Sequence, residues 1–334
     1  MNQILVKNEI AHSDIQEDAL ILHLQRLSTE DGPGLRTTVF FKQCMLNCTW
    51  CHNPESISRE VELQWFQSRC IGCQTCLKSC PLNCLQLTDD GLQIDRESCD
   101  GCGECTRVCP TLAMEQLGNT ISLEGLFEEV LKDRAYFEKS EQGGVTVSGG
   151  EPLLQADFVR HLFQRLQAEG IHTALDTCGF SSAGQLQKVI PFCDMVLFDL
   201  KEIDTDRHRA FTGQSNEVIF KNLLKVRDVI LQEKPALKLW IRTPLIPGTT
   251  ANRENITRIG QFLAKELSNV VERWELLAFN NLARDKYSRL GKNWQFADTP
   301  LMTKEDLEKA EEWARRSGVD PRIVFVTGAV RVEE

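Results

Sequence analysis

Basic residues are scarce relative to acidic ones in this chain of 334 residues: 38 Lys and Arg stand against 48 Asp and Glu, which gives a net charge of −10. Such a chain lacks the basic surface with which proteins bind nucleic acid or anionic membranes. We therefore expect neither partner, and the acidic excess indicates solvated surface.

Long apolar runs are also missing, since none approaches the roughly 18 residues that a membrane span requires. Residues 1–19, MNQILVKNEIAHSDIQEDA, lack the basic start and the apolar stretch of a secretory leader. These two absences predict a cytoplasmic protein.

Cysteine, in contrast, is abundant: twelve of the 14 cysteines lie between Cys44 and Cys109. In a reducing cytoplasm, C-x2-C spacing indicates metal ligands rather than disulfides. The stretch CMLNCTWC gives Cys44, Cys48 and Cys51 the spacing of a metal site with one ligand missing. An open coordination position is typical of catalytic metal sites.

The densest stretch is an internal repeat with a period of 29 residues. Both halves have the bacterial ferredoxin pattern C-x2-C-x2-C-x3-C-P, in which the fourth cysteine of each half ligates the cluster of the other half. The pattern predicts two four-iron clusters, one held by Cys70, Cys73, Cys76 and Cys109, the other by Cys99, Cys102, Cys105 and Cys80.

Two zinc sites are the alternative, because zinc also accepts four thiolates. Zinc sites pair two C-x2-C units across a longer gap, however, and do not use four closely spaced cysteines followed by proline. Cys84, Cys178 and Cys193 lie outside these patterns, and we expect them to be buried thiols that pack as small apolar side chains.

The rest of the chain is long enough for one large α/β domain and alternates helical with strand-like segments. Apolar residues at helical spacing predict a helix at 123–131, which Gly143 and Gly144 would end. Strands are predicted at 37–41, 145–148, 172–176, 194–199, 238–242 and 273–279. This alternation is typical of a parallel sheet, either open or barrel-like.

A distinctive motif follows each predicted strand: the three-cysteine loop after the first, then SGGEP (148–152), DTCG (176–179), DLK (199–201), RTPLIPG (242–248) and FNN (279–281). In β/α barrels the C-terminal ends of the strands meet at one mouth, so these motifs would face one cavity. Each also has a purely structural explanation, because Gly-Gly pairs form turns and Asp176 or Asp199 could cap a helix.

Together, GPGLRTTVFFKQCMLNCTWCHNPES, SGGEP, DTCGF, DLK and the double insert resemble the glycyl-radical-enzyme activating enzymes of the radical S-adenosylmethionine (SAM) superfamily. The resemblance implies a third four-iron cluster on Cys44, Cys48 and Cys51, whose fourth iron is chelated by SAM. One-electron cleavage of SAM would give methionine and a 5′-deoxyadenosyl radical. This radical would abstract hydrogen from a backbone glycine of a partner glycyl radical enzyme.

The resemblance also places residues around SAM, namely Trp50, His52, Asn53, Gly149, Gly150, Glu151, Asp176, Thr177, Asp199, Lys201, Arg242 and Asn280. Gly149, Gly150 and Glu151 would lie against the methionyl amino group. Lys201 and Arg242 would contact SAM, and the guanidinium could pair with its carboxylate. Asp176 and Asp199, with backbone oxygens near Thr177 and Leu197, would form a monovalent-cation site. For His52, an exposed loop position is the alternative.

Two positions depart from the family pattern. Gln43 precedes the first cluster cysteine where the family usually has Gly, which predicts a different backbone there. Asn280 stands where many members have His after the last barrel strand, which leaves its contact with SAM open.

The expected fold is an α/β partial (β/α)6 TIM-like barrel formed by residues 1–62 and 117–334. A ferredoxin-like α+β module at 63–116 would be inserted between the first strand and the following helix. A flavodoxin or ferredoxin would donate electrons, the insert would relay them or dock the partner, and the chain would be a monomer. The alternatives are a radical SAM enzyme acting on a small molecule or peptide, and an electron-transfer iron-sulfur protein.

Overall fold

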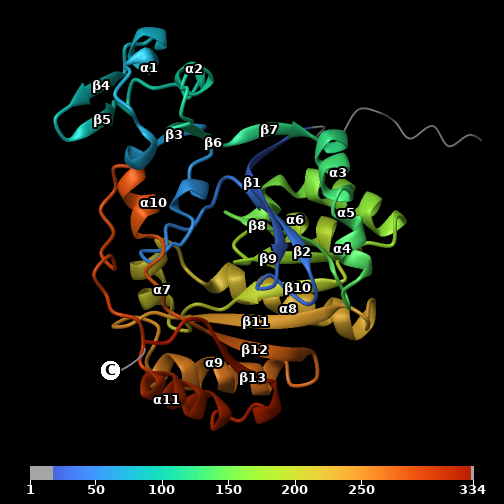
Figure 1. The fold of residues 1–334 in the computed structure, drawn as a ribbon. Helices are drawn as coiled ribbons and strands as arrows, with labels where there is room; N and C mark the ends of the chain where they lie inside the picture. The colour runs from blue at the N-terminus through green and yellow to red at the C-terminus, as the bar shows by residue number, and fades with distance from the viewer. Residues whose placement is uncertain (1–17, 332–334) are drawn as a thin grey trace, which may run out of the picture.

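A computed structural model describes residues 18–331. Its centre is a nine-stranded sheet (Figure 1). In spatial order the strands are β13 (Val324–Thr327), β12 (Val271–Ala278), β11 (Lys238–Leu245), β10 (Met195–Asp199), β9 (His172–Thr177), β8 (Gly144–Gly149), β2 (Arg36–Phe41), β1 (Asp18–Ser28) and β7 (Asn119–Ser122). In this spatial order, each strand from β13 to β2 is parallel to its neighbour. Strand β1 pairs antiparallel with both β2 and β7. Among the described strands the order begins at β13 and ends at β7, so the barrel is open.

All six predicted strands are present, and this confirms the partial barrel. We expected six parallel strands, but the described residues form seven, because β13 also pairs with β12. With only four residues, β13 has too little sequence to show a pattern. The antiparallel strands β1 and β7 extend the other edge beyond the predicted set.

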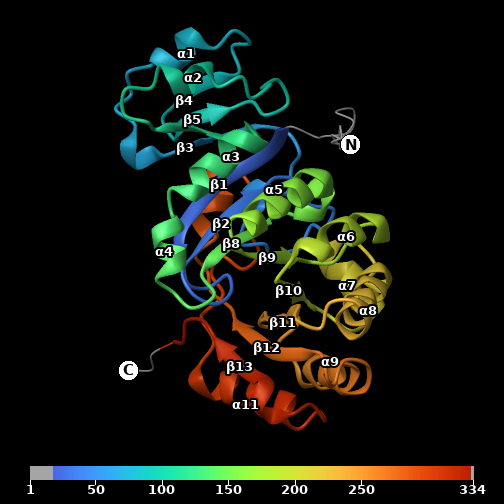
Figure 2. The same cartoon turned by 90° about the vertical axis from the view of Figure 1, so that its right-hand side faces the viewer.

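Helices cover the outer face of the sheet (Figure 2). They are α3 (Leu123–Leu131), α5 (Ala156–Ala168), α6 (Ala183–Val189), α8 (Glu217–Gln232), α9 (Arg253–Glu266) and α11 (Lys304–Arg315). The helix predicted at 123–131 is α3, and it buries Leu126, Phe127 and Val130. It ends at Leu131 rather than at Gly143, and a short second helix, α4 (Arg134–Glu138), follows. Between them Asp133 turns inward to accept hydrogen bonds from Arg26 and Thr37.

The insert follows the loop after β2 and stands apart from the sheet at the top of Figure 1. Its base is an antiparallel pair, β3 (Glu62–Trp65) with β6 (Met114–Leu117), and its tip is a second pair, β4 (Leu85–Thr88) with β5 (Gly91–Ile94). Two short helices, α1 (Thr75–Ser79) and α2 (Glu104–Arg107), carry Cys76 and Cys105, two of the predicted cluster ligands. The insert has a small apolar core of its own, to which Leu63, Leu85, Leu92 and Met114 belong.

A buried lysine joins the barrel to the insert. Lys42, at the end of β2, has no exposed surface. Its ammonium donates to the carbonyl of Glu55 at 2.8 Å and pairs with Glu62 at 3.2 Å, where the insert begins. Because a buried ammonium without partners is strongly unfavourable, this pair fixes how the insert leaves the barrel.

No helix within residues 18–331 combines the length and the apolar character that crossing a bilayer requires. The predicted barrel also includes residues 1–17 and 332–334, which lie outside the described residues, as does most of the segment examined for a secretory leader.

Candidate active site

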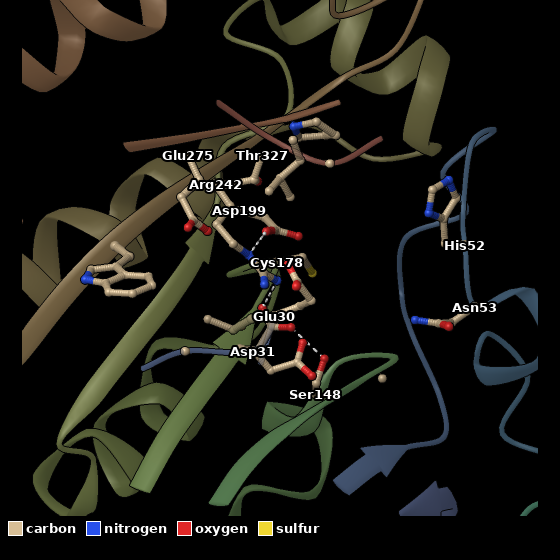
Figure 3. A pocket seen from close by; sticks show the side chains of 18 of the residues that line it. Glu30, Asp31, His52, Asn53, Ser148, Cys178, Asp199, Arg242, Glu275 and Thr327 are labelled. Atoms are coloured by element: carbon tan, nitrogen blue, oxygen red, sulfur yellow. Dashed lines mark hydrogen bonds and ion pairs between the residues drawn. The ribbon is translucent and has the colours of Figure 1, made fainter. Parts of the chain in front are cut away.

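The C-terminal ends of the parallel strands surround one cavity of about 1070 Å³. The predicted residues that line it are Cys44, Cys48, Trp50, Cys51, His52, Asn53, Gly149, Gly150, Asp176, Thr177, Asp199, Lys201, Arg242 and Asn280. In Figure 3, His52 and Asn53 lie on one side, and Cys178, Asp199 and Arg242 face them from the strands on the other. Arg242 lies within β11, three positions before the strand ends, and it still reaches the cavity.

The loop with the three cysteines is held in place by its backbone. The amides of Asn47 and Thr49 donate to carbonyls of α7 (Thr205–Thr212), at 2.8 Å and 3.0 Å. The indole of Trp294 donates to the Thr49 carbonyl at 3.1 Å. A loop fixed from two sides can present its thiols to the cavity at defined positions.

The donor set of this loop fits an iron-sulfur cluster. Burial raises the pKa of the Cys48 thiol to about 12 and that of Cys51 to about 11. These thiols therefore stay protonated at neutral pH unless a metal displaces their protons, which is the way metal sites form on cysteine. Three thiols on one face of a large cavity leave room for a cluster and for a further ligand.

The backbone before Cys44 differs from the expectation. Gln43 has φ +83°, the left-handed region that favours glycine, so the loop keeps the conformation of a glycine in spite of the substitution. Its amide donates to the Ser56 carbonyl at 2.7 Å, and its carbonyl accepts from the Glu151 amide at 2.8 Å. A Cβ at Gly150 would lie 2.2 Å from this same carbonyl oxygen. Gly150 is therefore required where β8 passes the cysteine loop.

Glu151 does not reach the cavity, unlike the other residues predicted around SAM. Its side chain has no exposed surface and accepts hydrogen bonds from the Thr177 hydroxyl at 2.8 Å and the Cys178 amide at 2.9 Å. Burial raises the pKa of this carboxyl group to about 7, although its hydrogen bonds from Cys178 and Thr177 oppose the shift. The carboxyl group thus braces β8 against β9, and the motif faces the cavity through Ser148, Gly149 and Gly150 instead.

A cluster of charged side chains lies across the ends of the three neighbouring strands β9, β10 and β11. Arg242 pairs with Asp176 on β9 and with Asp199 on β10, the latter at 3.3 Å, and Lys201 pairs with Asp199 at 2.5 Å. Ser148 donates to Asp176 at 2.5 Å. Burial would raise the pKa of Asp199, but Lys201 and Arg242 outweigh it and hold that pKa below its usual value. Asp176, Asp199, Lys201 and Arg242 thus form one connected set of acidic and basic side chains on this wall.

The opposite wall is held by α10 (Arg284–Arg289). Lys286 donates to the His52 carbonyl at 3.0 Å and to the Asn53 side chain at 2.9 Å. His52 is half-buried against Phe279 and Trp294, and its Nε2 has no hydrogen-bond partner among the described residues. His52 is thus part of the cavity wall and not an exposed loop residue.

Two lining residues, Ser148 and Cys178, lie inside the predicted motifs but were not singled out as site residues. Sequence reasoning missed others altogether, namely Glu30, Asp31, Trp240, Arg273, Glu275 and Thr327. Asp31 belongs to the turn before β2 and accepts from Thr38 at 2.6 Å. Cys178 was expected to be an ordinary buried thiol, and it is buried, but it also borders the cavity and contacts Glu151. Its position directly after the predicted Thr177, inside the DTCG motif, is the signal that could have identified it. Cys193 is buried in the core.

The insert brings its cysteines together in two groups. A cavity of about 20 Å³ is bordered by Cys70, Cys73, Cys76 and Cys109, and another of about 10 Å³ is bordered by Cys80, Cys84, Cys99, Cys102 and Cys105. Apart from Cys84, these groups have the membership that crossed ligation predicts. We refer to them as the Cys70 cage and the Cys99 cage.

Comparison with known proteins agrees with this arrangement. Residues 97–258 match the model of the radical SAM superfamily, and residues 69–113 match that of the 4Fe-4S dicluster domain. The (2S)-3-sulfopropanediol dehydratase activating enzyme of Klebsiella oxytoca is 39% identical over 81% of this chain and 85% of its own length. The trans-4-hydroxy-L-proline dehydratase activating enzyme of Clostridioides difficile is 38% identical over 91% of this chain and 98% of its own.

Among solved structures, a radical SAM methyltransferase from Sphaerobacter thermophilus has a similar fold. It is 12% identical and aligns with a TM-score of 0.50 over 92% of this chain and 76% of its own. At this identity the likeness concerns the fold alone.

Proposed function

Because this chain belongs to the family of radical SAM enzymes that activate glycyl radical enzymes, we propose that the cavity described above is where it generates a glycyl radical on a separate, large enzyme. The observation that carries the proposal is the set of three cysteines on one fixed loop, facing a cavity of about 1070 Å³ lined by charged residues. When bound, the cluster supplies the electron that cleaves SAM into methionine and a 5′-deoxyadenosyl radical, which takes hydrogen from a backbone glycine of the partner.

The chain's own residues would bind and orient SAM. Cys44, Cys48 and Cys51 would hold the cluster, and the backbone of Gly149 and Gly150 would lie against the methionyl amino group. The positive φ of Gly149, +108°, and the close approach of Gly150 to the cysteine loop allow the backbone to come near a ligand there. Trp50, His52, Asn53, Thr177 and Asn280 would complete the walls.

Lys201 and Arg242 would receive the SAM carboxylate. Both cations already lie at the cavity wall, paired with Asp176 and Asp199. If they turn toward an incoming carboxylate, the two Asp side chains lose their cations, and a monovalent cation bound by Asp176 and Asp199 would replace part of that charge. We therefore propose that a cation binds together with SAM rather than before it.

The electrons would come from a flavodoxin or a ferredoxin, and the insert would hold two further four-iron clusters, which makes three in the chain. The many free thiols fit a reducing cytoplasm and strictly anaerobic chemistry. We propose that the chain acts as a monomer, because one chain contains every residue of the proposed site.

The identity of the partner does not follow from the relatives. Two of them have nearly equal identity to this chain and carry the names of different dehydratases. Only the glycine-bearing loop of a partner has to enter the cavity, so the reaction of the partner leaves no trace on its walls.

The test uses the reduced, reconstituted protein, SAM and candidate glycyl radical enzymes, mixed without oxygen and examined by EPR. We expect a glycine-centred doublet with one partner, together with one equivalent of 5′-deoxyadenosine per radical formed. Turnover of SAM on a small molecule or peptide, with no doublet from any candidate partner, would contradict the proposal.

A further inference from the structure

The Cys99 cage contains one thiol more than a four-iron cluster requires. Five cysteines border its cavity of about 10 Å³, whereas four border the Cys70 cage. The additional residue is Cys84, which is only 6% exposed and packs in the small core of the insert. A buried thiol can be merely a packing group, so its position relative to the cluster ligands decides its role.

Cys84 lies beside one particular ligand position. Its sulfur is 3.3 Å from the sulfur of Cys80, the residue that crosses over from the other half of the repeat. Two sulfurs bound to one tetrahedral metal with bonds of about 2.3 Å lie about 3.8 Å apart. The observed separation is about 0.5 Å shorter than this, so the sulfur of Cys84 is near enough to that of Cys80 to reach the same iron.

The other half of the repeat provides an internal control. Adding 29 to the number of Cys84 gives Ala113, which has the same relation to Cys109. The turns are nearly identical: Asn83 and Leu112 have φ +52° and +53°, and each amide donates at 3.3 Å to the carbonyl of the preceding cluster cysteine. Because the backbone is the same, the two cages differ at this position only in the side chain, a thiol in one and a methyl group in the other.

We propose that Cys84 is an alternative ligand for the iron that Cys80 holds, so that the cluster of the Cys99 cage keeps four irons when Cys80 is unavailable. The inference rests on the crossed cluster assignment of the proposed function. In the exchange the Cys84 thiol gives its proton to solvent and forms an iron–sulfur bond, while the bond to Cys80 breaks and that thiolate takes up a proton. No electron is transferred, and the cluster keeps its oxidation state.

The experiment compares full-length variants reconstituted anaerobically with iron and sulfide, by iron content and by EPR. Cys80→Ala and Cys84→Ala should each retain the wild-type content of about 12 irons per chain, and the double variant should lose up to about four, or retain a three-iron cluster. Cys109→Ala should show the same loss as the double variant, because Ala113 stands where Cys84 stands in the other half and no replacement thiol is available. Cys109→Ala with Ala113→Cys should regain it.

Each outcome decides one part of the inference. A deficit in Cys80→Ala as large as in the double variant would overturn the role of Cys84, whether or not the protein folds normally. If the wild type itself holds only about four irons, the cages bind no clusters and the assignment beneath the inference fails instead. If the wild type holds about 12 irons and Cys109→Ala holds fewer, the cluster assignment stands. The iron content of Cys80→Ala then tests the role of Cys84 alone.

Discussion

The cysteines of this chain stand in two settings that differ in the space around them. Cys44, Cys48 and Cys51 face a cavity of about 1070 Å³, whereas the cages of the insert enclose about 20 Å³ and 10 Å³. A cluster that has four thiolates and no adjoining space can only hold and pass electrons. A cluster with three thiolates and free space beside it can also bind a substrate. The surroundings, and not the cysteine itself, separate the two roles.

The two settings are also assembled differently. Each cage forms from residues within about 40 positions of one another, around short helices and tight turns. The large cavity forms from strand ends between β2 and β13, so its geometry depends on the register of the whole sheet. Substitutions near the cavity should therefore affect SAM chemistry without changing the cages.

Cys48→Ala should have the largest effect, because it removes a ligand of the open site and leaves both cages intact. Without a third thiolate the catalytic cluster is lost, so reductive cleavage of SAM should fall to background, while about eight of about 12 irons remain in the insert. Cys193→Ala is the matched control, because Cys193 is fully buried in the core and does not border the cavity. Formation of 5′-deoxyadenosine at the normal rate by Cys48→Ala would place the catalytic cluster elsewhere.

Gly150→Ala should be the next most damaging change. The new Cβ would lie 2.2 Å from the Gln43 carbonyl oxygen, so the loop that carries Cys44 must shift. A displacement of about 1 Å can lower a rate by about 100-fold, and we expect a loss of this order in SAM cleavage with unchanged cage spectra. Gly184→Ala in α6 is the control, because apart from its chain neighbours and its own helix backbone no described atom lies within 4 Å of its Cβ position. Equal activities of the two variants would contradict the proposed packing of β8 against the loop.

Arg242→Gln should weaken SAM binding rather than abolish the cluster. The side chain is 11% exposed and serves both Asp176 and Asp199, so its loss leaves two buried carboxylates with less compensation. Hydrogen bonds to charged groups contribute about 1.5–3 kcal/mol, so the Kd for SAM should rise about 10- to 100-fold. Lys238→Gln on the same strand removes only an exposed pair with Glu272 and should leave the Kd unchanged. An unaltered Kd in Arg242→Gln would remove Arg242 from the SAM site.

Gln43→Gly should have the smallest effect. The informative result is whether it raises or lowers the free energy of unfolding. A residue other than glycine in the left-handed region costs about 1 kcal/mol or more, so relieving it at Gln43 should raise the free energy of unfolding by up to about 1 kcal/mol. SAM cleavage should stay within about twofold of wild type, because the backbone already has the conformation of a glycine. Reduced stability measured by denaturant unfolding would show that the Gln43 side chain contributes more than its backbone costs.

The parts of this molecule that sequence predicts are those fixed by local spacing. The ferredoxin repeat predicted both cages, and the motifs at strand ends predicted most of the cavity wall. What escaped prediction depends on contacts between distant segments. The inward direction of Glu151 follows from hydrogen bonds with Thr177 and Cys178 on the next strand. The positive φ of Gln43 follows from bonds with Ser56 and Glu151.

Cys84 shows the same limit within one motif. Its spacing from Cys80 is visible in the sequence, but a separation of three intervening residues does not say whether two sulfurs meet. The turn at Asn83, in the left-handed region, brings them to 3.3 Å. The identical turn at Leu112 places Ala113 at the corresponding position, so the backbone conformation repeats in both halves but the thiol does not.

Of the three proposed clusters, only the one on Cys44, Cys48 and Cys51 should be open to substrate, and EPR of the reduced protein with and without SAM measures this. We predict that SAM shifts the signal of a single cluster, leaves those of the two cages unchanged, and has no effect on any signal in Cys48→Ala. Shifts in the cage signals, or a shift that persists in Cys48→Ala, would contradict the division between an open catalytic site and two closed cages.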